Sequence, residues 1–325
     1  MNMEVDQNLI VYFNGQFVPM REARVGILTH ALHYGTGVFE GIRAYWDETA
    51  KELYVLRPRE HYQRWKQNCG ILRIGVAPTA DELGRITAEL LRRNNFHADV
   101  YVRPLAYKCA QRIGVAPDDQ DDFAIVAVPF GEYFEARDGL HACVSSWRRN
   151  NDNAIPPRAK IAGAYANSAL ASDDAHRAGF DEAILLNESG HVTEGATCNL
   201  FMVRQGRLIT PPITEDVLEG ITRDAVMELA RCELGVETVE RPIDRSELYV
   251  CDELFLSGTG VAIAPVVRVD HRPIKDGVIG PITRRLVHLY YEATRGHTPA
   301  YRKWLLPVYS TAHQAETARM ETSVA

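Results

Sequence analysis

A lysine in a small, apolar segment is the first residue of this chain that could carry chemistry. The chain holds only six lysines among 325 residues, and Lys160 lies in the segment Arg158–Gly163, just before an expected helix. Desolvation disfavours the ammonium form of a lysine and so lowers its pKa. The neutral amine is the form that adds to a carbonyl carbon to make a Schiff base. Lys160 is therefore a candidate nucleophile, although an isolated lysine is more commonly a surface residue.

Three further segments carry groups that suit an aromatic, phosphorylated ligand. Glu194 follows an apolar strand and its turn; there a carboxylate could keep a pyridine nitrogen protonated, or could be an ordinary turn residue. Gly220-Ile221-Thr222 opens a helix, where backbone amides can bind phosphate or Thr222 can act simply as the N-cap. Ser257-Gly258-Thr259-Gly260 offers hydroxyls at a strand end, or merely a turn.

The elements that must position these groups mix helices and strands. Asn14-Gly15 between Leu9–Phe13 and Gln16–Val18 predicts a β-hairpin, and Thr79–Asn94 predicts an amphipathic helix. Because strands and helices do not alternate strictly, the pattern favours an α+β or mixed α/β fold over a doubly wound sheet. We expect a small N-terminal α/β domain over 1–131, an interdomain loop over 132–140, and a larger C-terminal domain over 141–325 that carries Lys160.

Composition and motifs exclude several classes of protein. The net charge of −7 comes without a basic stripe, so nucleic acid is not an expected partner. The apolar runs are too short for a membrane span, and six scattered cysteines suit a reduced, soluble, cytoplasmic protein. The spacing of Gly35, Gly37 and Gly41 is one residue too long for a dinucleotide fingerprint. His30 and His33 have no third partner at metal-ligand spacing, so no metal is expected.

Taken together, the order and spacing of these segments resemble those of the fold type IV (D-amino acid aminotransferase-like) pyridoxal-phosphate enzymes. Within that group, the branched-chain amino acid aminotransferases are the nearest match, and the resemblance runs from about Leu9 to Thr294. The motifs that carry it are Lys160 with Tyr165, Glu194 in Glu-Gly-x-x-x-Asn-Leu-Phe, Leu-x-Gly-Ile-Thr-Arg around Thr222, Ser-Gly-Thr at Ser257, the block His30–Arg43, and Arg57-x-x-Glu-His-x-x-Arg64.

The resemblance implies pyridoxal 5′-phosphate as cofactor and assigns it a set of residues. Lys160 matches the Schiff-base lysine, which also shuttles the substrate proton. Tyr165 matches the partner of the cofactor's phenolic oxygen, and Glu194 the partner of its ring nitrogen. The positions that match phosphate contacts are Arg64, Ile221, Thr222 and Thr259.

The resemblance also implies the substrates and the assembly. It predicts ping-pong transamination between L-leucine, L-isoleucine or L-valine and 2-oxoglutarate, in a homodimer or higher homo-oligomer. Arg103 matches an arginine that can engage the distal carboxylate of glutamate, and Tyr34 is expected to come from the neighbouring subunit. The remaining substrate positions are Phe39, Gly41, Tyr101, Phe130 and Tyr133, with Thr259 and Gly260 for the α-carboxylate. Phe130, which stands where relatives often have tryptophan, departs from the pattern.

Other activities share the fold and remain open at this point. One is a D-amino acid or (R)-amine transaminase, against which Tyr101-x-Arg103 argues. Another is a lyase of the aminodeoxychorismate type, which would release pyruvate without a 2-oxo acid acceptor. A non-catalytic binding module is disfavoured because Lys160 is present. A panel of amino donors tested with 2-oxoglutarate separates these alternatives.

Overall fold

The computed structural model describes residues 6–131 and 138–310, and the chain divides into two compact units. Unit 1 comprises residues 1–131 and 292–325, and unit 2 comprises residues 132–291. This division differs from the expected one, which placed all of 141–325 in the second domain. The difference arises because β17 (Leu305–Pro307) pairs antiparallel with β5 (Glu52–Leu56) and so returns to unit 1. Of the expected interdomain loop, 132–137 lies outside the described residues, and β8 begins at Leu140.

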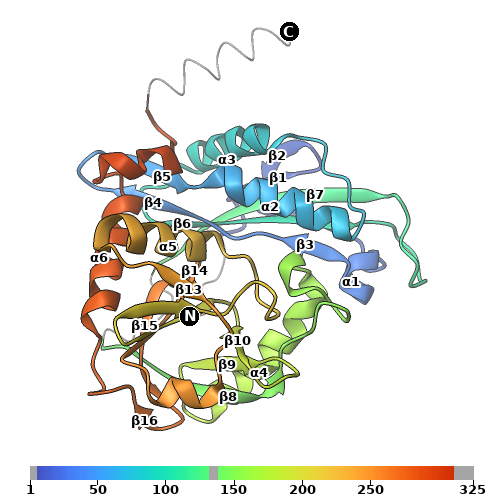
Figure 1. Cartoon of the computed structure of the whole chain (residues 1–325). Coiled ribbons are helices and arrows are strands. Elements are labelled where there is room, and N and C mark those ends of the chain that lie inside the picture. Colours follow the sequence, from blue (N-terminus) through green and yellow to red (C-terminus); the bar gives the residue numbers. More distant parts are fainter. Residues whose placement is uncertain (1–5, 132–137, 311–325) are drawn as a thin grey trace. The chain divides into compact units, whose positions relative to one another are not determined.

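Within the described part of unit 1, eight strands form one antiparallel sheet (Figure 1). Its order is β17-β5-β4-β6-β7-β1-β2, with β3 beside β6. The hairpin predicted at Asn14-Gly15 is confirmed: both residues have positive φ, as such a tight turn requires. The other strand bounds are β1 Ile10–Phe13, β2 Gln16–Pro19, β3 Gly37–Phe39, β4 Ile42–Asp47, β6 Val100–Lys108 and β7 Asp121–Pro129.

Two helices of unit 1 lie along one face of this sheet, α2 (Pro58–Ile71) and α3 (Ala80–Asn94) (Figure 1). Thr79 caps α3 in a capping box with Glu82, as the predicted start at Thr79 implies. Helix α2 buries Trp65 completely. The remaining helical segments of this unit are short: α1 His30–Tyr34, η1 Met20–Glu22 and η5 Pro299–Trp304.

In unit 2 the described strands form a nine-stranded sheet that closes on itself. Strand β10 pairs with both β9 and β11, so the ring β10-β9-β8-β15-β14-β11 has no open edge. Its interior is apolar, with Leu200, Met202 and Leu254 almost fully buried. The bounds are β8 Leu140–Arg148, β9 Glu182–Leu186, β10 Val192–Gly195, β11 Asn199–Arg204, β12 Arg207–Thr210, β13 Thr238–Glu240, β14 Glu253–Gly258, β15 Ala262–Val269 and β16 Arg272–Pro273.

Helix α4 (Tyr165–Arg177) packs the small side chains of Ala171 and Ala175 toward β9, and α5 (Ile221–Leu234) contacts β14. Helix α6 (Pro281–Thr294) runs from unit 2 into unit 1, because the division falls between Tyr291 and Glu292. The short helical segments of unit 2 are η2 Pro157–Ala159, η3 Ala162–Ala164 and η4 Arg245–Tyr249. The predicted mixed α/β class is therefore confirmed. Among the described residues, no helix has the length and apolarity needed to cross a bilayer.

Candidate active site

Lys160 lies at a strained point of the backbone between two short helical turns of unit 2. It follows η2 with φ 50 and ψ 42, a left-handed conformation that costs a residue with a Cβ energy. Its side chain is half-buried, and Nζ donates a hydrogen bond to the Tyr165 hydroxyl at 2.8 Å. Tyr165 is the first residue of α4. The structure thus brings together the lysine and the tyrosine that the sequence singled out.

Glu194 lies inside β10 and is only 3% exposed. Its Oε1 forms an ion pair with Arg149 at 2.7 Å, while its Oε2 accepts from Asn199 Nδ2 at 2.9 Å and from the Leu218 amide at 3.2 Å. Burial raises the pKa of Glu194, and the positive charges of Arg149 and Lys160 act against that rise. Glu194 is therefore a buried side chain fixed by three partners, and the positive charge of Lys160 acts on it.

The start of α5 is tied to Glu194 through Asn199. The helix begins at Ile221 after the N-cap Gly220, and no side chain caps it. Thr222 is its second residue, so the simple N-cap interpretation of Thr222 is wrong. A Cβ at Gly220 would lie 1.9 Å from Asn199 Oδ1, so glycine is needed for this close approach. The first-turn amides of a helix have no intrahelical acceptor, and together with the helix dipole they favour an anion.

The turn between β14 and β15 completes this part of unit 2. Asn199 and Ser257 are paired residues of β11 and β14, so the Ser257–Gly260 segment begins beside Asn199. The Ser257 hydroxyl is buried and has no hydrogen-bond partner. Thr259 and Gly260 follow in the turn, both half-buried. A buried hydroxyl without a partner is uncommon in native proteins and suggests a ligand or water in the working state.

In unit 1, Arg64 of α2 is held by a buried carboxylate. Glu40 is fully buried and accepts from Arg64 Nε and Nη2, both at 2.8 Å. The same carboxylate accepts from the Gly41 amide at 3.1 Å and lies 2.9 Å from His61 Nδ1. Burial lowers the pKa of His61, although Glu40 opposes the change. Arg64 is thus fixed in orientation by a dry, doubly hydrogen-bonded ion pair.

The predicted substrate positions of unit 1 form a cluster around Tyr101. Arg103 Nη2 donates to the Tyr101 hydroxyl at 3.0 Å, and the Arg103 guanidinium lies 4.4 Å from the Phe39 ring centroid. The Tyr101 and Phe130 rings are 5.2 Å apart. A Cβ at Gly41 would lie 2.1 Å from the Tyr101 hydroxyl, so glycine makes room for that oxygen. The cluster combines aromatic faces with one exposed cation.

Two predicted substrate residues stand apart from this cluster. Tyr34, in α1, accepts a hydrogen bond from the Gly114 amide at 3.0 Å and packs on His30. Tyr133 lies outside the described residues.

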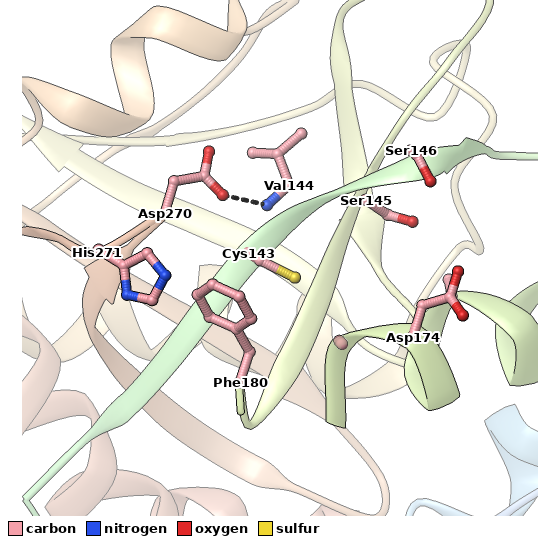
Figure 2. Close-up of a pocket in the computed structure, with 10 residues that line it drawn as sticks. Cys143, Val144, Ser145, Ser146, Asp174, Phe180, Asp270 and His271 are labelled. Carbon is pink, nitrogen blue, oxygen red and sulfur yellow. Dashed lines mark hydrogen bonds between the residues drawn. The ribbon is translucent and has the colours of Figure 1, made fainter. Parts of the chain in front are cut away.

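A pocket of about 330 Å³ lies elsewhere on unit 2 (Figure 2). Its walls come from β8, α4 and the turn after β15, and none of the predicted site residues lines it. Its carboxylates are already engaged: Asp270 accepts from the Val144 amide at 2.9 Å and Asp174 from Trp147 Nε1 at 2.8 Å (Figure 2 shows the former). We assign no chemistry to this pocket.

Comparison with known proteins places the chain in a family. The profile of amino-transferase class IV matches residues 37–269. The chain belongs to the class IV aminotransferases. A probable branched-chain-amino-acid aminotransferase of Aquifex aeolicus is 50% identical to it over 92% of this chain and 96% of that protein.

Two solved structures resemble this class IV aminotransferase closely. The holo, pyridoxal-phosphate form of the branched-chain amino acid aminotransferase from Thermobaculum terrenum has a TM-score of 0.89 at 40% identity, covering 94% of this chain and 100% of that one. The T.th. branched-chain amino acid aminotransferase complexed with N-(5′-phosphopyridoxyl)-L-glutamate has a TM-score of 0.88 at 40% identity, covering 93% and 99%.

The residues of this class IV aminotransferase fit pyridoxal phosphate as cofactor. Lys160 offers an amine for the carbonyl carbon, with the Tyr165 hydroxyl 2.8 Å from it. Glu194 offers a buried carboxylate suited to a ring nitrogen. The start of α5, where no side chain caps the helix, and the unpartnered hydroxyl of Ser257 suit phosphate oxygens. Within unit 2, the chemistry of these donor groups therefore matches each polar part of the cofactor.

Three residues of this aminotransferase that support the site were not assigned roles from the sequence. Glu40 and Asn199 stood inside the quoted motifs, so their positions were visible but their contacts were not. Arg149 gave no signal, because it follows Arg148 and precedes the polar residues Asn150, Asn151 and Asp152. Only the fold shows that Arg148 is exposed whereas Arg149 is buried.

Proposed function

We propose that this chain transfers amino groups between the branched-chain L-amino acids leucine, isoleucine and valine and 2-oxoglutarate, by a ping-pong mechanism with pyridoxal phosphate. The observation that carries the proposal is Lys160, hydrogen-bonded to Tyr165 and electrostatically coupled to the buried Glu194. The named activity of the Aquifex relative and the glutamate-derived ligand in the T.th. structure support the substrates.

Lys160, Tyr165 and Glu194 divide the chemistry among them. When bound, pyridoxal phosphate supplies an electron sink for the electrons released at the substrate α-carbon. Lys160 would hold the cofactor covalently through Nζ, and the same amine would act as the general base and acid that moves the substrate α-proton. The Tyr165 hydroxyl orients Nζ through their hydrogen bond. Glu194, as a carboxylate, keeps the ring nitrogen protonated.

The phosphate is assigned to groups of both units, each of which suits an anion by its own chemistry. Ile221 and Thr222 present the first-turn amides of α5, and Thr259 adds a hydroxyl. Arg64 contributes a guanidinium whose orientation Glu40 fixes. These groups would bind the phosphate through their positive charge and through oriented hydrogen-bond donors.

The substrate side chain is assigned to the cluster around Tyr101. Phe39, Tyr101 and Phe130 offer apolar area, which favours a branched alkyl group by roughly 25 cal/mol for each Å² buried. Arg103 pairs with the distal carboxylate of glutamate, because a desolvated anion without a cation is costly. The backbone of Thr259 and Gly260 is assigned to the α-carboxylate. One cluster thereby accommodates an alkyl chain in one half-reaction and an anion in the other.

A homodimer is the assembly we propose, because unit 1 exposes a connected apolar surface. The segments 23–32 and 110–115 are joined by the Arg112 amide, which donates to the Leu28 carbonyl at 3.2 Å. Ile27 is 81% exposed and Val115 is 76% exposed. Single exposed apolar residues are normal on a monomer, but a connected apolar surface is typical of an interface. The apolar side chains of this surface are Val25, Ile27, Leu28, Leu32, Ile113 and Val115. Tyr34 lies in the same helix as Leu32, α1, so an interface over this surface would place Tyr34 next to the partner subunit.

Sedimentation velocity tests the assembly. Leu32→Asp should shift the protein toward monomer, whereas Val278→Asp, which changes an exposed valine of unit 2, should not. A Leu32→Asp protein that keeps the wild-type sedimentation coefficient at micromolar concentration contradicts the proposed interface.

Borohydride reduction tests the covalent role of Lys160. Reduction of the holoenzyme followed by peptide mapping should find the pyridoxyl group on the peptide containing Lys160 and on none of the other five lysines. Label on Lys66, Lys108 or another lysine would overturn the assignment. A panel of L- and D-amino acids and (R)-1-phenylethylamine then decides the donor class, with L-leucine expected to react fastest.

Substitution of Arg103 tests the substrate assignment. Arg103→Ala should weaken the use of glutamate and 2-oxoglutarate strongly and leave leucine little changed, because only the former carry a distal carboxylate. Arg93→Ala is a matched control, since Arg93 also stacks on an aromatic ring, 4.3 Å from the centroid of Phe17. Equal loss of leucine and glutamate activity in Arg103→Ala would make Arg103 a structural residue.

A further inference from the structure

Arg149 is a buried arginine that touches the carboxylate on which the proposed chemistry depends. It follows the last residue of β8, and its amide donates to the Leu186 carbonyl at 2.9 Å. Its Nη2 lies 2.7 Å from Glu194 Oε1, with the two side chains only 7% and 4% exposed. Its Nη1 donates to the Ser168 hydroxyl of α4 at 3.2 Å. The guanidinium is therefore fixed between α4 and β10.

The two oxygens of Glu194 have different partners. Oε1 faces the positive charge of Arg149, whereas Oε2 accepts from two neutral donors, Asn199 Nδ2 and the Leu218 amide. Arg149 Nε is buried and has no hydrogen-bond partner, so the guanidinium is kept in place without full satisfaction of its donors. Buried polar groups of this kind are costly to a fold. A buried charge of this kind is explained if Arg149 acts on the neighbouring Glu194 carboxylate.

We propose that Arg149 is a positioning residue that keeps the Glu194 carboxylate ionised and fixed in the orientation in which it serves the ring nitrogen of the cofactor. The proposal rests on the proposed function, because Glu194 has this task only if pyridoxal phosphate is bound. Arg149 itself touches Glu194 and Ser168 and acts on the chemistry through Glu194 alone.

The physical reason is the balance between burial and charge at Glu194. Burial favours the neutral carboxylic acid and raises the pKa, while Arg149 is the largest influence that lowers it. Lys160, from the turn before α4, adds a smaller positive influence. Cys198 also faces this carboxylate, but burial raises the pKa of its thiol well above the ordinary value, so it stays neutral. A protonated Glu194 cannot form a charged pair with a protonated ring nitrogen.

Removal of the charge should therefore act most strongly in the pH range between the pKa of Glu194 in the wild type and its higher pKa in the variant. In Arg149→Gln the pKa of Glu194 rises further, so Glu194 is protonated over a wider range. At neutral pH we expect the half-reaction with L-leucine to slow by roughly 10- to 150-fold, the range for loss of a hydrogen bond to a charged group. The rate should recover as the pH rises through the higher pKa, so the acid limb of the rate profile moves to higher pH.

The first experiment uses the apoprotein and does not depend on activity. With ¹³C-labelled glutamate, the side-chain resonance of Glu194 is identified by its absence from Glu194→Gln. Its titration midpoint should lie higher in Arg149→Gln than in the wild type. Arg148→Gln is the matched control, because Arg148 is the exposed neighbour, and it should leave the midpoint unchanged. An unchanged midpoint in Arg149→Gln overturns the proposal.

The second experiment measures the half-reaction of the holoenzyme against pH by stopped flow. Arg149→Lys keeps the charge and should restore most of the rate and the wild-type profile. Ser168→Ala loosens Arg149 without removing its charge, and should shift the acid limb in the same direction by a smaller amount. A uniform loss at every pH, with no shift of the limb in Arg149→Gln or Ser168→Ala, would mean that Arg149 is merely structural.

The two proposals fail in different ways. If the wild type neither carries pyridoxal phosphate on Lys160 nor transaminates, the proposed function fails whatever the Glu194 titration shows. If the wild type transaminates but Arg149→Gln and Ser168→Ala keep its pH profile, only the role of Arg149 fails. Should Arg149→Gln not fold, Ser168→Ala still decides the question, because it loosens Arg149 while retaining the cation beside Glu194.

Discussion

The buried ion pair between Arg64 and Glu40 leads to a prediction about the stability of unit 1. Glu40 is fully buried and accepts hydrogen bonds from Arg64 Nε and Nη2 at 2.8 Å. Because burial lowers the pKa of His61, its neutral ring donates the Nδ1 proton to the same carboxylate at 2.9 Å. Glu40→Gln keeps the shape of the side chain but removes its charge. The change leaves the arginine desolvated and unbalanced, so we expect a large loss of stability.

The magnitude follows from the partners that remain. Breaking a buried ion pair by removing one partner costs about 3–5 kcal/mol. The glutamine oxygen can still accept one hydrogen bond, so we expect a value near the lower end, about 3 kcal/mol. With a denaturant slope of about 2 kcal/mol per M of urea, the unfolding midpoint of unit 1 should fall by roughly 1.5 M.

Tryptophan fluorescence measures this change mainly in unit 1, because Trp46, Trp65 and Trp304 lie there and Trp147 lies in unit 2. The Trp65 indole is fully buried in α2, and its Nε1 donates to the Val38 carbonyl at 2.9 Å. Urea unfolding should be followed in apoprotein, so that cofactor binding does not contribute. Glu48→Gln is the control, because Glu48 is an exposed residue of the same unit, paired with Lys51, and its loss should leave the midpoint in place. If Glu40→Gln behaves like Glu48→Gln, the buried pair is not the support that we infer.

Three other changes have expected outcomes. Arg64→Ala should weaken cofactor affinity by roughly 10- to 150-fold, as measured by equilibrium dialysis, and unchanged affinity would refute its phosphate role. Gly220→Ala places a Cβ 1.9 Å from Asn199 Oδ1 and should destabilise unit 2 by about 1–3 kcal/mol in urea unfolding, and a neutral result would show that the loop yields freely. The pKa of His297 is raised, first by its hydrogen bond to Asp47, so the stability this pair contributes is complete below the ordinary value of 6.5 and is lost as the pH rises through the higher pKa. Urea midpoints against pH should show that loss in the wild type and not in His297→Gln.

Local signals explain which parts of the fold the sequence could predict. The Asn14-Gly15 hairpin and α3 with its Thr79 cap were placed to within a residue or two, because turn chemistry, capping and helical periodicity depend on near neighbours. Strands β3 and β4 were not predicted. They lie in the glycine-rich block around Gly41, where nearly every side chain is buried and no alternation of polar and apolar residues survives.

Contacts between distant segments explain what the sequence could not predict. The motifs placed Lys160 and Glu194 in the site, but nothing near Arg149 in the chain indicated that it would lie against Glu194, 45 residues away. The return of β17 to unit 1 was missed for the same reason, since a strand of three residues carries too little pattern to identify its partner.

The pairing of β17 with β5 also bears on how the chain is made. Strand β17 is the outermost strand on its side of the unit 1 sheet, so before it arrives the edge of β5 is open. At the usual 5–20 residues per second, a ribosome needs roughly 10–35 s to proceed from residue 131 to β17. During that time a nascent chain carries an exposed strand edge, which is the part of a sheet most prone to pair with another chain. Fragments that end before Leu305 should therefore aggregate, and expression of unit 1 alone calls for a design that splices residues 292–310 back onto it.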